Sequence, residues 1–271
     1  MIRSETTTRE QSVKRTSSHE IEITHHEVTV TNLPASADGL TIVQLSDLHR
    51  GCGNTDSLIK EAIARANALE PDFVFVTGDF VDEHASDVLP VVKMVHGLRA
   101  ANGVYACIGN HDHRGDPVLL QSALEAAGIN VLYNTATEVM PGLWFAGVDE
   151  LYEGQPDLEA ALSPVPDGVA LLFLAHHPDT LDRVPMDKPM FMLSGHTHGG
   201  QIVLPFPTPW MVCRFHLRTR FVHGWYTRGQ AQLYVNRGIG VTGGGPFGRR
   251  FRCLPEISVF RLRCDSNPKG K

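Results

Sequence analysis

The feature that most constrains the fold of this chain is a repeated pattern in which a short apolar run ends in a cluster of Asp, Asn or His residues. There are five such clusters, and four of them follow directly on an apolar run. They are Asp47-Leu48-His49, Gly78-Asp79-Phe80-Val81-Asp82, Gly109-Asn110-His111-Asp112, His176-His177-Pro178 and Gly195-His196-Thr197-His198. Short continuous apolar runs bounded by turn residues are typical of buried β-strands. We therefore expect these clusters where strands end and loops begin.

The first half of the chain alternates between predicted strands and predicted helices. Apolar runs predict strands at 21–30, 40–45, 73–77 and 104–108, and helical spacing predicts helices at 55–69, 87–99 and 117–127. Asp116-Pro117 is typical of an N-cap followed by proline at the first helical position. From residue 40 onward, this order is typical of a βαβ sheet with right-handed crossovers. Ligands of such sheets collect at the carboxyl ends of the strands, where Asp47, Asp79 and Asn110 are expected.

The second half is richer in predicted strands. They are expected near 131–132, 137–139, 143–148, 169–175, 190–193, 221–226, 232–235 and 257–262, with short helices near 157–162 and 179–184. The predicted fold class is α/β, with two mixed β-sheets packed as a sandwich and flanked by helices, in a single domain over 19–264. His176, His196 and His198 should reach the same edge from the second sheet. Residues 1–18 and 265–271 are polar and lack periodicity, which predicts disordered ends.

The composition narrows the classes of function. At 42% hydrophobic residues the chain has enough apolar material for a sizeable core. The net charge of −6 argues against a nucleic-acid partner, because such partners favour clustered Lys and Arg. The five Cys form no CxxC pair and are expected to be free thiols. No apolar run approaches the roughly 20 residues of a transmembrane helix, and 1–18 lack the apolar core of a signal peptide, so the cytoplasm is the expected compartment.

The chemistry of the five clusters indicates a site for two divalent metal ions. Carboxylate, amide and imidazole groups with no interleaved Cys suit a metal pair that handles phosphate better than a structural zinc site. Asp79 is the natural bridge, because its strand is expected between those that carry Asp47 and Asn110. Taken alone, an Asp or Asn in such a motif is more often a turn residue. The Asp, Asn and His residues of all five clusters would have to be coincidental together, so we predict a metal-dependent phosphoester hydrolase.

The set DxH, GDxxD, GNHD, a lone His and GHTH resembles the calcineurin-like metallophosphoesterases. The segments 46–49, 194–201, 235–240 and 255–257 resemble more closely the bacterial YkuE/YaeI-like branch of that family. The resemblance covers about 40–262, with the motifs in the family's order. It implies a four-layer α/β/β/α fold and hydrolysis of a phosphodiester or pyrophosphate bond by a hydroxide that bridges two metal ions.

The resemblance also implies roles for particular residues. The first ion would be held by Asp47, His49, Asp79 and His198, and the second by Asp79, Asn110, His176 and His196. His176 is preferred to His177 because the family's lone His directly precedes x-Pro. His111 would act as the general acid, oriented by the second carboxylate of GDxxD, Asp82, for which Asp112 is the rival. The donor types accept Mn, Fe, Zn, Ni or Co.

The resemblance implies a phosphorylated small-molecule substrate or a lipid-linked or nucleotide-linked one such as UDP-diacylglucosamine. The alternatives are a phosphomonoesterase or protein phosphatase of the same fold, or a non-catalytic scaffold. A nuclease is disfavoured by the acidic charge.

Two loops have open interpretations. The stretch 202–220 is apolar and proline-broken with several arginines, and it is expected either to cover the core or to contact a membrane or an acyl chain. The first interpretation is slightly favoured. The glycine-rich stretch 243–250 is expected to be a flexible turn, with phosphate binding by Arg249 and Arg250 as the alternative.

Overall fold

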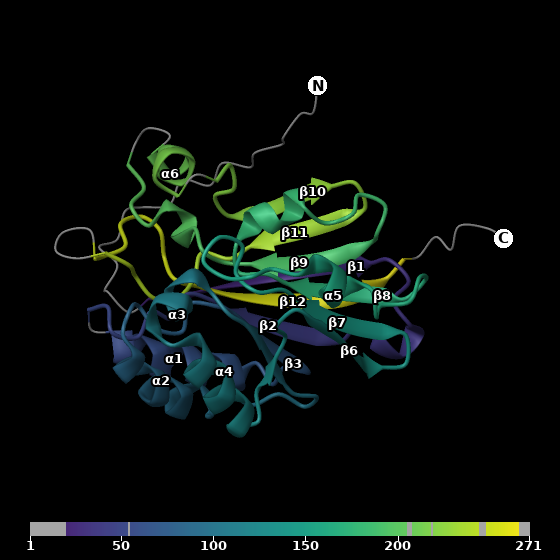
Figure 1. Ribbon diagram of the computed structural model, residues 1–271, viewed down its shortest axis with the longest axis horizontal. Coiled ribbons are helices and arrows are strands. Elements are labelled where there is room, and N and C mark those ends of the chain that lie inside the picture. The colour runs from purple at the N-terminus through teal and green to yellow at the C-terminus, as the bar shows by residue number, and fades with distance from the viewer. Residues whose placement is uncertain (1–19, 54, 205–207, 218, 244–247, 266–271) are drawn as a thin grey trace.

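Two six-stranded mixed sheets pack face to face in the computed structural model, which describes residues 20–53, 55–204, 208–217, 219–243 and 248–265. The predictions of disorder for 1–18 and 265–271 lie outside the described residues, apart from Asp265. Figure 1 shows the two sheets as the middle layers, with helices on their outer faces. The predicted α/β class with a flanked sandwich is confirmed.

The first sheet contains the βαβ units predicted for the first half of the chain. Its order is β1 (Glu22–Val30), β12 (Glu256–Cys264), β2 (Thr41–Leu45), β3 (Phe73–Thr77), β4 (Val104–Cys107) and β5 (Asn130–Val131). All neighbours pair in parallel except β12 with β2. Strand β3 lies between β2 and β4, as the placement of Asp79 required.

Three helices bury one face each against this sheet, namely α1 (Thr55–Ala68), α2 (Val88–Val95) and α4 (Pro117–Ala126). Asp116 caps α4 as predicted, because its side chain accepts a hydrogen bond from the amide of Leu119. Helix α2 ends four residues before the predicted boundary. Its last turn tightens into i→i−3 bonds at Gly97 and Leu98, which end the α-helical ladder.

The second sheet has the order β10 (Gly224–Arg228), β11 (Ala231–Val235), β9 (Met190–Ser194), β8 (Ala170–Leu174), β7 (Leu143–Gly147) and β6 (Thr135–Met140). The four inner strands are parallel and both edge strands are antiparallel. Helix α5 (Leu158–Leu162) and the 3₁₀ helix η3 (Pro178–Asp182) accompany it. The strand predicted at 221–226 instead begins at Gly224, because the amides of Phe221 and Val222 donate to the side chains of Thr219 and Tyr226 and not to a neighbouring strand.

Aromatic side chains fill the space between the sheets. Phe73, Phe75 and Tyr105 from the first sheet each meet the ring of Phe145 edge-on, with centroids 4.9–5.0 Å apart. Full burial of one such side chain contributes about 1.5–3 kcal/mol, and edge-to-face contacts add to it. This core fixes the two sheets relative to each other, so loops that leave them at the same end are held at fixed distances.

Candidate metal centre

The predicted ligands come together where strands of both sheets end. Asp47 and His49 follow β2, Asp79 follows β3 and Asn110 follows β4, whereas His176 follows β8 and the pair His196 and His198 follows β9. The Nε2 atom of His176 lies 3.2 Å from Oδ2 of Asp79, which joins the two sheets. On the other side, Nε2 of His198 lies 3.4 Å from Oδ1 of Asp47. The ligands predicted from the sequence therefore form a single cluster at the edge where the strands of both sheets end, which we call the rim.

Backbone conformation sets this cluster apart from the rest of the chain. Ten non-glycine residues among those described have positive φ, and half of them are predicted ligands. These five are Asp47 (51°), His49 (45°), Asp79 (54°), His196 (73°) and His198 (51°). The left-handed conformation costs about 1–2 kcal/mol per residue, and such strain concentrates at functional sites. Hydrogen bonds between the loops hold it, since the amide of His49 donates to the carbonyl of Asp79.

Two motif glycines allow the loops to approach each other. A Cβ atom on Gly109 would collide with the carboxylate and amide of Asp79, and one on Gly195 would collide with Ser46 and the carboxylate of Asp47. The glycines of GNHD and GHTH are therefore required by close packing around the two aspartates.

Three overlapping groups of side chains present atoms that could hold metal ions. They are Asp47, His49 and His198; Asp47, Asp79 and His176; and His49, Asp79 and His111. Asp47 and Asp79 are each shared by two groups, and both are almost completely buried.

The donor atoms have the spacing that a bound cation requires. Around an ion with ligand bonds of about 2.0–2.2 Å, neighbouring donors lie roughly 3–3.5 Å apart. Here Nε2 of His49 lies 3.0 Å from Nε2 of His198 and 3.3 Å from Oδ2 of Asp79. Buried carboxylates and facing imidazole nitrogens are costly unless a cation or protons compensate them. The residues therefore fit a pair of divalent ions.

His196 lies outside those three groups and reaches the cluster through Asn110. The Asn110 Oδ1 atom lies 2.9 Å from Nδ1 of His196 and 3.2 Å from Nε2 of His176. His177, the residue after His176, turns away from Asp79: its ring lies against that of His196 at 4.1 Å, tilted by 37°, and its Nδ1 accepts a hydrogen bond from the amide of Asp179. The geometry thus brings His176 rather than His177 to Asp79.

Without metal, protons divide unequally among the imidazoles. Burial opposes charge on His49, but hydrogen bonds and charge from Asp79 and Asp82 raise its pKa to about 9. Burial likewise opposes charge on His176, yet Asp79 raises its pKa to about 10. These two imidazoliums, against the effect of burial, hold the pKa of Asp79 well below its usual range. Burial lowers the pKa of His196 and His198 far below 6.5, so they stay neutral.

His111 is partly exposed beside the cluster and is held by its backbone and by one ring nitrogen. Its amide donates to Oδ1 of Asp79 (2.9 Å), and its Nδ1 lies 2.6 Å from the carbonyl oxygen of Asp82. A carbonyl only accepts, so Nδ1 carries the hydrogen. The other nitrogen, Nε2, lies 3.4 Å from the guanidinium of Arg114.

Asp82 and Asp112 have different surroundings. The Asp82 carboxylate lies 3.1 Å from Nδ1 of His49 and 3.5 Å from Nδ1 of His111. Asp82 therefore contacts His111 most closely through its main-chain carbonyl oxygen. This refines the prediction that the Asp82 carboxylate orients the His111 ring. The Asp112 carboxylate is buried and accepts the amides of Phe80, Val81 and Gly109. Asp112 thus ties two loops together and does not contact the His111 ring.

Two further features go beyond the sequence predictions, and the first concerns Arg250, which the sequence offered as an alternative phosphate-binding residue. Arg250 points inward, with Nη2 3.3 Å from Nδ1 of His198 and Nε 2.9 Å from the carbonyl of Gly240, so it braces the ligand loop. Asp149 is buried after β7 and accepts hydrogen bonds from His113 (2.7 Å) and Tyr133 (2.6 Å). In the sequence, Asp149 directly follows the apolar run 143–148, as the predicted ligands follow theirs, and this signal could have identified it.

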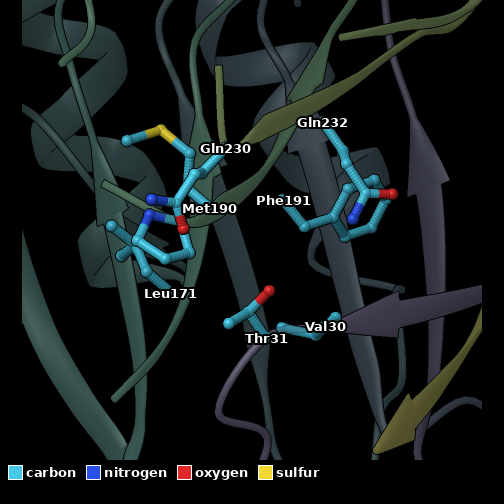
Figure 2. Close-up of a pocket in the computed structure, with 8 residues that line it drawn as sticks. Val30, Thr31, Leu171, Met190, Phe191, Gln230 and Gln232 are labelled. Atoms are coloured by element: carbon cyan, nitrogen blue, oxygen red, sulfur yellow. The ribbon is translucent and has the colours of Figure 1, made fainter. Parts of the chain in front are cut away.

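A pocket near the start of β8 and β9 has none of the donor groups of the candidate metal centre. Figure 2 shows its lining, which contains no ionisable side chain and consists of Val30, Thr31, Leu171, Pro189, Met190, Phe191, Gln230 and Gln232. The reactive groups described here lie at the other ends of these strands.

Comparison with known proteins agrees with the site. A family model described as calcineurin-like phosphoesterase matches residues 40–200. The chain is 34% identical over 256 residues to the uncharacterized metallophosphoesterase YkuE of Bacillus subtilis, covering 90% of this chain and 86% of that protein. It is 33% identical over 237 residues to phosphodiesterase YaeI of Escherichia coli, covering 82% and 81%. It is also 29% identical over 233 residues to a transmembrane protein with metallophosphoesterase domain of Danio rerio, covering 80% and 52%.

None of the helices within the described ranges combines the length and the hydrophobicity needed to cross a bilayer. All five cysteines are free thiols, as predicted. The family match spans more than half of the chain and includes all five motifs. With two relatives above 30% identity over most of their length, the chain belongs to the calcineurin-like phosphoesterase family.

Proposed function

We propose that this protein hydrolyses a phosphodiester or pyrophosphate bond with the help of two divalent metal ions. The observation that carries the proposal is the single cluster of buried donors at the joint end of both sheets, with His111 beside it. The name of YaeI, a phosphodiesterase, supports the diester over the monoester. The substrate would be a phosphorylated small molecule, or a lipid-linked or nucleotide-linked one. The five free thiols support a cytoplasmic location.

The donor groups suggest how the ions would be shared. One would be held by Asp47, His49 and His198 with Asp79, and the other by Asp79, Asn110, His176 and His196. Bound ions of this kind stabilise negative charge on a phosphoryl group and make water more acidic. The Asp82 carboxylate would fix the ring of His49 through Nδ1, leaving Nε2 to face the ion.

His111 would deliver the proton that the leaving oxygen needs. The Asp82 carbonyl holds Nδ1–H, so the proton delivered to the leaving oxygen would be a second one, carried on Nε2 by the imidazolium form of the ring. Arg114 places a positive charge beside this atom, and Glu153 holds the guanidinium at 3.0–3.1 Å through Nε. Arg114 would therefore contact a phosphate oxygen while His111 protonates the departing one.

Hydrolysis of bis-p-nitrophenyl phosphate tests this function directly. Purified protein supplied with Mn²⁺ should release nitrophenol, and a chelator should abolish the release. The monoester p-nitrophenyl phosphate should be the poorer substrate, and a preference for it would favour the phosphomonoesterase instead. Fully metallated protein that hydrolyses neither compound would refute the catalytic proposal and leave the scaffold.

A further inference from the structure

Acidic and basic residues are distributed very unevenly along this chain. Between Asp187 and Glu256 there is no Asp or Glu, whereas eight Arg and one Lys stand there. The whole chain nevertheless carries 30 acidic and 24 basic residues and a net charge of −6. The rest of the molecule is therefore strongly acidic, and this one segment is strongly basic.

Some of these arginines pair with other described residues, and others do not. Arg237 pairs with Glu256, Arg220 pairs with Asp182, and Arg250 braces the ligand loop. In contrast, Arg214, Arg249 and Arg252 are exposed, and no ion pair joins any of them to another described residue.

Large apolar side chains are exposed in the same segments. The described part of the chain has eleven exposed large apolar residues, and six of them lie between Asp187 and Glu256. One of the six is Trp225 in β10, and the other five lie at 204–215 and 251. They are Leu204 (46%), Trp210 (47%), Met211 (46%), Phe215 (70%) and Phe251 (48%). Within the stretch 202–220, Leu204, Trp210, Met211 and Phe215 face outward, whereas Cys213 and Thr219 are buried, so part of this stretch is left to contact something other than the core.

The segments that carry these residues are neighbours in the fold, although they come from two parts of the chain. The amide of Val203 donates to the carbonyl of Phe251 (2.9 Å), which joins 201–204 to 250–252. The amide of Leu204 bonds to Thr208 at the start of α6 (Thr208–Met211), and the rings of Trp210 and Phe215 meet at 5.9 Å. We call Leu204, Trp210, Met211, Phe215, Phe251, Arg214, Arg249 and Arg252 the arginine–aromatic patch.

The patch adjoins the candidate metal centre. The 3₁₀ turn η4 (His198–Gly200) contains a predicted ligand, and Gly200 packs so closely on Pro209 of α6 that a Cβ atom would lie 2.6 Å from it. Figure 1 shows α6 at the same end of the sandwich as α3 (Asn110–Gly115), which carries His111.

We propose that the arginine–aromatic patch docks on an anionic lipid surface and turns the metal-centre end of the molecule toward it. Exposed aromatic and aliphatic tips interleaved with arginines are the chemistry of an interfacial membrane contact. Each arginine near an anionic leaflet adds about a fivefold gain in affinity. The acidic remainder of the chain is repelled by the same surface, so charge alone orients the protein.

Other occupants fit the patch less well. A symmetric contact with a second copy would place the same unpaired arginines against each other, which disfavours it. Single-stranded nucleic acid would use arginines and stacked aromatic rings, but Leu204 and Met211 offer no stacking face. Hydrocarbon accepts all five apolar side chains.

Vesicle sedimentation with the full chain tests the docking. Phosphatidylcholine vesicles with about 30% phosphatidylglycerol should bind the protein, pure phosphatidylcholine should bind it at least about tenfold more weakly, and salt at about 0.5 M should release it. Arg214→Glu/Arg249→Glu and, separately, Trp210→Ser/Phe215→Ser should each weaken binding at least about tenfold. The matched control Lys60→Glu/Lys93→Glu makes the same charge change on exposed helix positions and should bind normally.

Three results would overturn the docking proposal. One is equal binding to neutral and anionic vesicles, and another is an equal loss in the lysine control. The third is absence of vesicle binding by the wild type, whether or not it binds an oligonucleotide or dimerises through the patch. Thermal unfolding of each variant shows that lost binding is not lost folding. Hydrolysis of a soluble diester plays no part in this test, so its outcome is independent of the proposed activity.

Discussion

The rim of predicted metal ligands and the arginine–aromatic patch lie at the same end of the molecule. Both depart from the usual placement of side chains, because the rim buries polar groups and the patch exposes apolar ones. At the rim, Asp47, His49 and Asp79 are polar and at most 1% exposed. In the patch, Phe215 is apolar and 70% exposed. Neither arrangement is what packing alone favours, since buried charge and exposed hydrocarbon both cost free energy. Both therefore indicate function.

The two regions differ in how rigidly the surrounding structure holds their side chains. The rim residues follow strands of a packed sandwich, and glycines and backbone hydrogen bonds hold their atoms at separations of about 3 Å. The patch stands on a short helix, a helical turn and an irregular loop, where exact positions matter less than total charge and apolar area. Single substitutions should therefore be severe at the rim and graded in the patch.

Asp79→Ala should have the largest effect, because this carboxylate belongs to two donor groups and contacts both His49 and His176. We expect metal affinity to fall by more than about a hundredfold and activity to fall below detection. Metal analysis and diester hydrolysis measure both. Asp116→Ala, which removes only the cap of α4, is the control, and an equal loss there would show that any loss of stability suffices.

His111→Ala should separate chemistry from metal binding. We expect turnover to fall by about 10²–10⁴ while metal content stays unchanged, since the general acid is lost and the deeper donors remain. Because His111 also stands in one donor group, loss of an ion from this variant would reassign it as a ligand.

Asp82→Asn should mainly lower turnover, whereas Asp112→Asn should mainly lower stability. The first should lower turnover by about 10–100-fold with little change in thermal stability, since it weakens the hold on His49. The second should lower unfolding free energy by about 1–3 kcal/mol, because the Asn side chain keeps one acceptor oxygen and turns an NH₂ donor toward at least one of the three buried amides that Asp112 now accepts. Equal changes in both variants would contradict these assignments.

The pH dependence of metal binding should be smaller but specific. In metal-free protein, His49 and His176 titrate near 9 and 10 instead of 6.5. Their protonation stabilises the metal-free fold fully below pH 6.5, and this stabilisation is lost as pH rises through about 9–10. Metals bind neutral imidazole, so affinity should rise about tenfold per pH unit for each proton displaced. Calorimetry in buffers of different ionisation enthalpy should detect proton release between pH 7 and 8, and its absence would contradict the assignment.

The rim was predictable from sequence because its signal is local. Apolar runs end where β2 and β3 end, and parallel strands bring Asp47 and Asp79 to one edge. The sequence did not reveal that the Asp82 carboxylate contacts His49 while its main-chain carbonyl holds His111, since both contacts depend on how the loops pack. Nor was the exposure of Trp210 and Phe215, because a proline-broken stretch without periodicity does not reveal which side chains face the core.

The measurement that tests the central claim most directly is the metal content of purified wild-type protein after saturation with Mn²⁺ or Zn²⁺ and removal of free ions. The account predicts two ions per folded chain, with fewer in His176→Ala and in His198→Ala. A folded wild-type protein that retains no ion would contradict the assignment of the rim as a dinuclear metal centre.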